Sequence, residues 1–152
     1  MLYQLKNLSE EEQSVVTKAP IWVTLLIACS DSDINEDEID RAKEIIHIKT
    51  YTTQNDVQDL YKELNLNLDS EIDQALISLS SVGSERLTFL EDNLKRLNKI
   101  FPKLDKSYAS QLYNSLRSLA LSVAQSEGGF FGIARISEQE QQFLKLPMLN
   151  KP

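Results

Sequence analysis

Cysteine, histidine and glycine are scarce in this chain of 152 residues, which contains one cysteine, one histidine and four glycines. The single cysteine, Cys29, cannot form an internal disulfide, and its apolar neighbours favour a buried thiol in a reducing compartment. One histidine and one cysteine cannot provide a zinc-type spacing, and the sequence has no nucleophile motif. We therefore expect a non-enzymatic protein that uses no organic cofactor.

Long hydrophobic runs are also missing. The apolar stretch at residues 21–29 is far shorter than the roughly 20 residues that a membrane span requires, and the N-terminus MLYQLKNLSEEE lacks the apolar core of a signal peptide. The formal net charge of -7 repels phosphate backbones and anionic membranes. We expect a soluble, cytoplasmic protein without membrane insertion or nucleic-acid binding, whose partners are cations or basic protein surfaces.

Apolar residues at helical spacing, in stretches poor in glycine, predict an all-α protein. Hydrophobic residues make up 41% of the chain, which is enough for one core and cramped for two domains. We expect a single compact bundle over residues 1–152, with about seven to eight helices.

The first helices are marked by caps and by apolar faces. Ser9 and Glu12 fit a capping box, and Pro20 fits the first turn of a second helix. The stretch IWVTLLIAC, residues 21–29, is apolar on nearly all sides and is expected in the middle of the bundle. The inward stripe of the next helix consists of three apolar residues: Ile39, Ala42 and Ile46. Its opposite face, expected in solvent, carries polar residues: Glu36, Asp40, Glu44 and His47.

Further helices are expected at about residues 54–65 and 70–82, the second ending near Gly83. Apolar residues spaced by three and four then run up to Pro102, which should end their helix. These residues are Leu87, Leu90, Leu94, Leu97 and Phe101. The long helix that follows has inward positions at Tyr108, Leu112, Leu116, Leu119 and Val123. A strip of serines on this helix would permit close contact with a neighbour: Ser115, Ser118 and Ser122.

An acidic stretch, CSDSDINEDEID, follows the apolar helix at residues 29–40. An EF-hand would need oxygen ligands at loop positions 1, 3 and 5, glycine at 6 and glutamate at 12. Asp31, Asp33 and Asn35 fit the first three positions, but Glu36 and Ala42 occupy the last two. The pattern therefore does not predict an EF-hand, although an oxygen-rich corner remains.

The segment VAQSEGGFFGIARISEQE, residues 123–140, repeats this arrangement. Both segments lead from a small, apolar helix end into an acid, Asp31 or Glu127, and then through a loop to an isoleucine. A capping residue follows in each, with a glutamate three positions on. These pairs are Asn35 with Glu38 and Ser137 with Glu140. The sequence thus contains an internal repeat with one acidic corner in each half.

A helix end followed by Asp-Gly-x-Ile-Ser-x-x-Glu is the pattern of the tellurite-resistance TerB-like family, which includes a domain of the membrane co-chaperone DjlA. This sequence resembles that family at both ends. The stretch ALSVAQSEGGFFGIARISEQEQQFL is close to the family pattern, and LLIACSDSDINEDE is a degraded form of it. Ser32 stands where the family has glycine, and Glu127 where it has aspartate. The resemblance covers most of the chain and implies one all-helical domain of two pseudo-repeated halves.

The resemblance also implies a non-enzymatic role in stress response of the tellurite type, with divalent cations bound at the acidic corners. Carried over residue by residue, the metal ligands are Asp31 and Glu38 in the first corner and Glu127 and Glu140 in the second. Asp33 is a local addition that supplies another oxygen. Calcium takes six to eight oxygen ligands, so backbone carbonyls, waters or the other corner would complete its shell.

Each of these acids also has a structural interpretation. The capping box alone accounts for Glu38 and Glu140, because acids in the first turn complement the helix dipole. Asp31 and Glu127 follow helix C-termini, where the dipole disfavours an anion, so either a cation or a loop-closing hydrogen bond would explain them. A protein-interaction module without metal, whose acidic face meets a basic partner, therefore stays open.

The GGFFG loop, residues 128–132, offers a second kind of contact. It lacks the preceding strand and the following Gly-Lys-Ser/Thr of a phosphate-binding loop. Phe130 and Phe131 either dock on a partner protein or anchor the loop in the core, and anchoring is the commoner arrangement.

Overall fold

The structure, a computed structural model, describes residues 2–28, 36–53, 55–79, 81–127 and 143–152. All regular elements in these ranges are helical, which confirms the all-α class. The α-helices are α1 (Glu10–Ala28), α2 (Glu36–Thr52), α3 (Gln58–Leu66), α4 (Leu68–Ile77), α5 (Gly83–Lys95), α6 (Leu97–Ile100) and α7 (Lys106–Glu127). Short 3-10 helices are η1 (Tyr3–Leu5), η2 (Asn55–Val57) and η3 (Phe101–Lys103). The helix count of the whole chain and its two repeated halves remain predictions.

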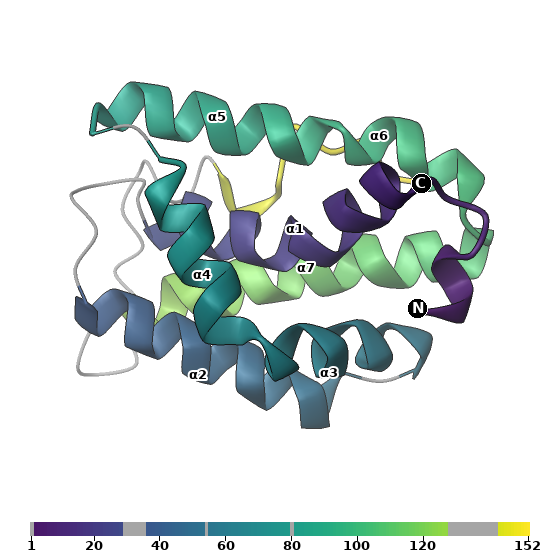
Figure 1. Ribbon diagram of the computed structural model, residues 1–152, viewed down its shortest axis with the longest axis horizontal. Helices are drawn as coiled ribbons and strands as arrows, with labels where there is room; N and C mark the ends of the chain where they lie inside the picture. The colour runs from purple at the N-terminus through teal and green to yellow at the C-terminus, as the bar shows by residue number, and fades with distance from the viewer. Residues whose placement is uncertain (1, 29–35, 54, 80, 128–142) are drawn as a thin grey trace.

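Helix α1 lies at the centre of the bundle, as its apolar sequence predicts. Every residue from 20 to 28 is buried, and Val15, Val16 and Ala19 are buried before them. The helix packs against each of the α-helices α2 to α7. Figure 1 shows α1 crossing the middle of the molecule, with α5 and α6 along one side and α2 and α3 along the other.

Pro20 does not begin a helix, so this prediction was wrong: α1 is one continuous helix with Pro20 inside it. Proline has no N–H to donate to the carbonyl four residues back, and its ring crowds that carbonyl, at a cost of about 3 kcal/mol. Each large apolar side chain that α1 buries contributes roughly 1.5 to 3 kcal/mol, so a few of them outweigh this cost. The Thr24 hydroxyl also donates to the Pro20 carbonyl over 2.8 Å.

The predicted capping box at the start of α1 is confirmed. The Glu12 N–H donates to Ser9 Oγ over 3.1 Å, and the Ser9 N–H donates to Glu12 Oε1 over 3.0 Å. Lys103 Nζ, in η3, donates to the other carboxylate oxygen of Glu12 over 2.6 Å. The hydrogen bonds from Lys103 and then from the Ser9 N–H lower the pKa of Glu12. The cap therefore also joins the start of α1 to the turn before α7.

Replacing Ser9 with alanine is expected to lower the free energy of unfolding by about 1 kcal/mol, because the Glu12 N–H loses its acceptor. Urea denaturation followed by circular dichroism measures this loss. The matched control is Ser84→Ala, at an exposed serine in the first turn of α5. Equal losses in the two variants would contradict a capping role for Ser9.

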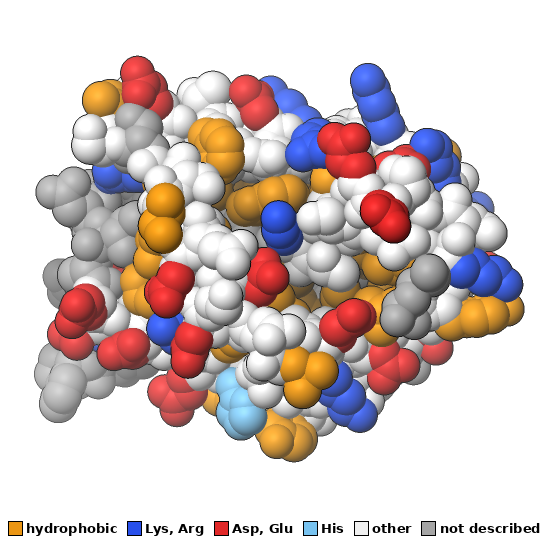
Figure 2. Space-filling model, viewed as in Figure 1, with side chains coloured by type: hydrophobic (Ala, Val, Ile, Leu, Met, Phe, Trp, Pro, Cys, Tyr) orange, Lys and Arg blue, Asp and Glu red, His pale blue; other side chains and the backbone are white. Residues whose placement is uncertain are grey.

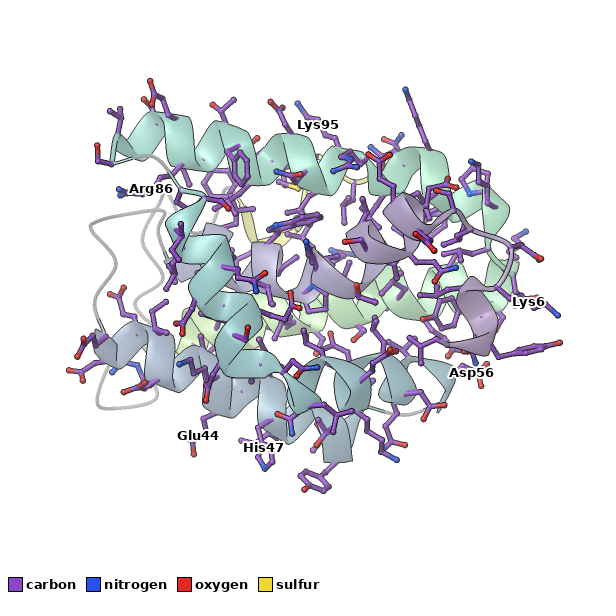
Figure 3. The ribbon with its side chains drawn as sticks, in the orientation of Figure 1. Lys6, Glu44, His47, Asp56, Arg86 and Lys95 are labelled. Atoms are coloured by element: carbon purple, nitrogen blue, oxygen red, sulfur yellow. The ribbon has the colours of Figure 1, made fainter. Side chains whose placement is uncertain are left out.

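Helix α2 has the two faces that its sequence predicts. Ile39, Ala42 and Ile46 are buried against the core. The polar face is exposed, and Figure 3 shows Glu44 and His47 pointing away from the bundle. His47 Nδ1 lies 3.3 Å from Asn65 Oδ1 at the end of α3, so the lone histidine is a surface residue.

The helix predicted at residues 70–82 is shifted, because α4 ends at Ile77 and Gly83 begins the next helix. Ser78 ends α4 by bonding back to it, since its hydroxyl donates to the Gln74 carbonyl over 3.0 Å. Val82 has an extended backbone before α5, and its carbonyl accepts the Arg86 N–H over 3.0 Å. Gly83 therefore marks a helix start, where the sequence pattern predicted a helix end.

Helix α7 buries all five of its predicted inward positions. Two serines of its predicted strip contact α2 and α3. Ser115 Oγ donates to the Tyr61 hydroxyl of α3 over 2.9 Å, and Lys49 Nζ of α2 donates to Ser118 Oγ over 2.8 Å. The strip thus combines close helix contact with hydrogen bonds between helices.

Candidate functional site

The two predicted acidic corners follow helices that run side by side. Helices α1 and α7 pack along each other and run in the same direction, so their C-terminal ends, Ala28 and Glu127, reach the same end of the bundle. Helix α2 begins at this end, with Glu36 (Figure 1). We name this region, bounded by Ala28, Glu36 and Glu127, the corner end.

Most of the predicted metal ligands lie outside the described residues. This applies to Asp31, Asp33 and Glu140, and also to the predicted partner-binding residues Phe130 and Phe131. Glu38 is half-buried in the first turn of α2. Glu127 is the last residue of α7, and only its backbone is described. The structure therefore brings the helix ends that carry Glu38 and Glu127 to the corner end.

The electrostatics of the corner end come from the helix termini. The last carbonyls of a helix have no partner within it, and they carry roughly half a negative charge in sum. Two parallel helices that end together place two such termini at one end of the bundle, and the N-terminus of α2, which begins there, carries the opposite partial charge. Uncoordinated carbonyl oxygens are also ligands that calcium accepts. Within the described ranges, His, Cys, Asp and Glu form no group of three or more that could hold a metal ion.

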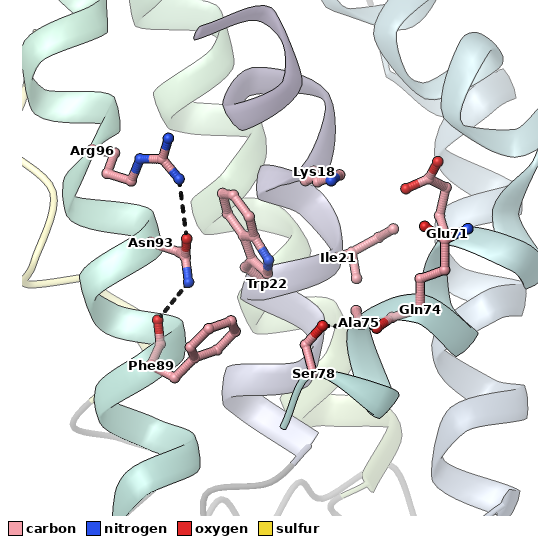
Figure 4. A pocket seen from close by; sticks show the side chains of 10 residues that line it. All are labelled: Lys18, Ile21, Trp22, Glu71, Gln74, Ala75, Ser78, Phe89, Asn93 and Arg96. Carbon is pink, nitrogen blue, oxygen red and sulfur yellow. Dashed lines mark hydrogen bonds between the residues drawn. The ribbon is translucent and has the colours of Figure 1, made fainter. Parts of the chain in front are cut away.

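A groove on another face brings together residues from α1, α4 and α5 (Figure 4). Its volume is about 260 Å³. We name it the α4–α5 groove and define it by six of its lining residues: Lys18, Trp22, Glu71, Ala75, Phe89 and Arg96. Figure 2 shows hydrophobic side chains gathered over α4 and α5 and in the hollow between them.

Helical spacing aligns the side chains of the groove. Lys18 and Trp22 are four residues apart on α1, so both face the same side. Phe89 on α5 and Arg96, the C-cap residue that follows α5, are seven residues apart and likewise share a face. Figure 4 shows Lys18 and Arg96 towards one end of the groove and Phe89 towards the other. One end of the groove is therefore charged, with Glu71 at the same end as Lys18 and Arg96, and the other end is aromatic.

The aromatic residues differ in exposure. Trp22 is 8% exposed and belongs to the core, whereas Phe89 is 39% exposed. Arg96 Nη2 donates to Glu11 Oε1 over 2.7 Å, and its Nη1 donates to Asn93 Oδ1 over 3.3 Å. The Arg96–Glu11 pair is open to solvent on both sides, so it contributes about 1 kcal/mol or less.

The sequence interpretation missed this groove. Two signals for it were present: Trp22 is the only tryptophan in the chain, and Lys18 is the only charged residue in α1 after Glu12. Neither signal shows that part of α1 stays uncovered by its neighbours, because the gap depends on the directions of α4 and α5.

Two tyrosines, Tyr61 and Tyr108, are buried in the core. Burial raises the pKa of Tyr61 to about 12, against a smaller opposing effect of the Ser115 hydrogen bond. Burial also raises the pKa of Tyr108, and the negative charges of Asp56 and Asp59 add to this shift. Both phenols therefore stay protonated at neutral pH and do not act as bases there.

None of the helices in the described residues combines the length and the apolar character that crossing a bilayer demands. Comparison with known proteins assigns no family, because no protein-family model, no curated protein and no solved structure matches the chain.

Proposed function

We propose that the chain is a non-enzymatic, TerB-like helical module whose two acidic corners bind a divalent cation, with calcium as the preferred ion. The observation that supports this proposal is the parallel packing of α1 and α7, which brings the helix ends before the two predicted corners to the same end of the bundle. Two pseudo-repeated halves would produce such an arrangement. The stress-related role of the tellurite type and the cytoplasmic location rest on the sequence alone.

The proposed ligands come from both halves of the chain. Asp31, Asp33 and Glu38 belong to the first corner, and Glu127 and Glu140 to the second. These carboxylates alone do not fill a calcium shell of six to eight oxygens. Backbone carbonyls and waters are of the same hard-oxygen type and would complete the shell. A cation there would also offset the negative termini of α1 and α7, of which the N-terminus of α2 balances only one.

A second candidate function is a protein-interaction module without metal. It is favoured by the acidic face of α2, where Glu36, Asp40 and Glu44 are exposed at four-residue spacing. Such a row of carboxylates suits a basic partner surface. The loop with Phe130 and Phe131 is the other proposed contact of this module.

A cation titration of the metal-free protein tests the first proposal. The chelator-treated chain is expected to melt about 5 to 10 °C higher once free calcium reaches about 100 times the dissociation constant, since ligand binding to the native state then adds about 2.7 kcal/mol. The measurement is thermal unfolding by circular dichroism during calcium, magnesium and manganese titrations. The Asp31→Asn, Glu127→Gln double variant should lose this rise.

The matched control is the Asp40→Asn, Glu44→Gln double variant, which makes the same charge change on the exposed face of α2. It should keep the full rise in melting temperature. A flat response of the unaltered protein would sink the cation proposal and leave the interaction module. Equal losses in both double variants would mean that calcium only screens negative charge.

A further inference from the structure

We infer that the α4–α5 groove is a docking site for an acidic amphipathic helix of a partner protein. One apolar side chain of that helix inserts between Trp22 and Phe89, and its carboxylates meet Lys18 and Arg96. The inference concerns a different face from the corner end and holds whether or not a cation binds there.

The groove exists because two helices diverge over a third. Helices α4 and α5 both pack on α1. They are joined through the short segment between Ile77 and Gly83, and from there they run apart, with α1 visible between them (Figure 1). Ile21 and Trp22 of α1 therefore form the floor of the groove, and α4 and α5 form its walls.

The size of the groove favours a side chain over a larger ligand. Its volume of about 260 Å³ falls below the roughly 300 to 1,000 Å³ typical of small-molecule sites. This space suits one large apolar side chain of the kind that anchors a helix in a groove. Phe89, which lines the groove and is partly exposed, offers apolar surface at its edge.

The charge around the groove sets the character of the partner. Beyond Lys18 and Arg96, an adjoining hollow that shares Arg96 is lined by three more cations, Lys95, Lys99 and Lys103, and by three acids, Glu11, Glu12 and Asp92. With Glu71 counted, cations outnumber acids by five to four over the two hollows, on a chain whose formal net charge is -7. An acidic partner is repelled by most of this surface and attracted here, which directs it to the groove.

Acidic residues of the chain already engage part of this cationic strip. Glu11 pairs with Arg96 over 2.7 Å, Glu12 with Lys103 over 2.6 Å, and Asp92 with Lys95 over 3.8 Å. Such exposed pairs are weak, so a carboxylate of the partner can replace Glu11 at little cost. Glu71 lies on the α4 wall, which places the acidic residues of the partner on the α5 side.

A peptide selection on the full chain tests the inference. The probe is a phage-displayed library of randomised helical peptides, selected on the unaltered protein. We expect enrichment of peptides that carry a large apolar residue with Asp or Glu three or four positions away. Binding of a synthetic copy is followed by tryptophan fluorescence, which reports on the groove because Trp22 is the only tryptophan.

Matched variants locate the binding site. Phe89→Ala is expected to weaken binding about tenfold or more, whereas Tyr51→Ala, at an exposed aromatic residue of α2, leaves it unchanged. Arg96→Gln is expected to weaken it about fivefold, and Arg41→Gln, at an exposed arginine of α2, to leave it unchanged. Glu11→Gln should strengthen binding, because Arg96 is then released for the partner.

Several results would overturn the inference. They are a selection without enrichment, enriched peptides that lack acidic residues, and binding that survives both Phe89→Ala and Arg96→Gln. Sedimentation of the protein alone supplies another: a concentration-dependent dimer that Phe89→Ala abolishes would mean that a second copy of the chain occupies the groove. Circular dichroism confirms that each variant is folded.

Discussion

Replacing Leu26 with alanine is expected to lower the free energy of unfolding by about 3 to 5 kcal/mol. Leu26 is fully buried in α1, the helix that contacts each of the other α-helices described here. Because α1 packs against each of the helices α2 to α7, it cannot shift to fill the cavity without losing contacts elsewhere. The cost should therefore lie in the upper part of the range seen for buried leucines.

The matched control is Leu66→Ala, which removes the same atoms at a position that is 80% exposed. This change should alter the free energy of unfolding by about 0.5 kcal/mol or less. Urea denaturation at neutral pH measures both variants, with the denaturant slope compared to detect changes in the unfolded state. A loss below about 1 kcal/mol for Leu26→Ala would contradict the central position of α1.

The sequence was most informative where one local pattern determines the structure. The stretch at residues 21–28 is apolar on all sides, and no surface helix could satisfy it, so its central position followed directly. The capping box of Ser9 and Glu12 requires only four consecutive residues, and it formed as predicted. Inward positions of α7 were likewise set by their spacing.

The sequence was misleading where burial outweighs a local preference. Pro20 alone favours a helix start, but the apolar residues on both sides of it hold one helix through it. The sequence interpretation also missed the cap of α7, where Asp105 Oδ1 accepts the N–H groups of Ser107 and Tyr108 over 3.0 and 3.2 Å. The pattern Asp-Lys-Ser-Tyr has no glutamate at the third helical position, so it lacks the capping-box signature.

Contacts between distant segments could not be predicted from any local pattern. Asn98 Nδ2 donates to the Met148 carbonyl over 2.9 Å, and Asn98 Oδ1 accepts the Asn150 N–H over 2.7 Å. This pair of bonds holds a segment that buries Phe143 and Leu146 in the core. The corner end and the α4–α5 groove could not be predicted from a local pattern either, because each depends on the relative directions of helices far apart in the sequence.

Alkaline pH is expected to destabilise the fold through its buried tyrosines. In the unfolded chain a tyrosine loses its proton near pH 10, whereas burial raises the pKa of Tyr61 to about 12 in the native state. Between these values the native state binds more protons than the unfolded state, so the free energy of unfolding falls as the pH rises. The full contribution of Tyr61 is present below pH 10 and is lost by about pH 12, and it amounts to about 3 kcal/mol.

Tyr61→Phe should remove this dependence, because phenylalanine has no proton to lose. At neutral pH the variant is expected to be about 1 kcal/mol less stable, since the Ser115 hydroxyl loses its bond to the phenol oxygen. Above pH 10 its stability should fall less steeply than that of the unaltered protein, and the two should converge or cross. Tyr108, whose pKa is also raised, leaves some slope in the variant. Urea denaturation at steps between pH 9 and about pH 11.5 measures these slopes.

The control for this comparison is Tyr51→Phe, because Tyr51 is 73% exposed on α2. This variant loses the same hydroxyl group at the surface and leaves the core intact, so its slope should match that of the unaltered protein. If Tyr61→Phe kept the full slope, the phenol of Tyr61 would have to ionise in the native state near its ordinary pKa. Water would then have to reach the contact between α3 and α7. This result would contradict the close helix packing described at the serine strip.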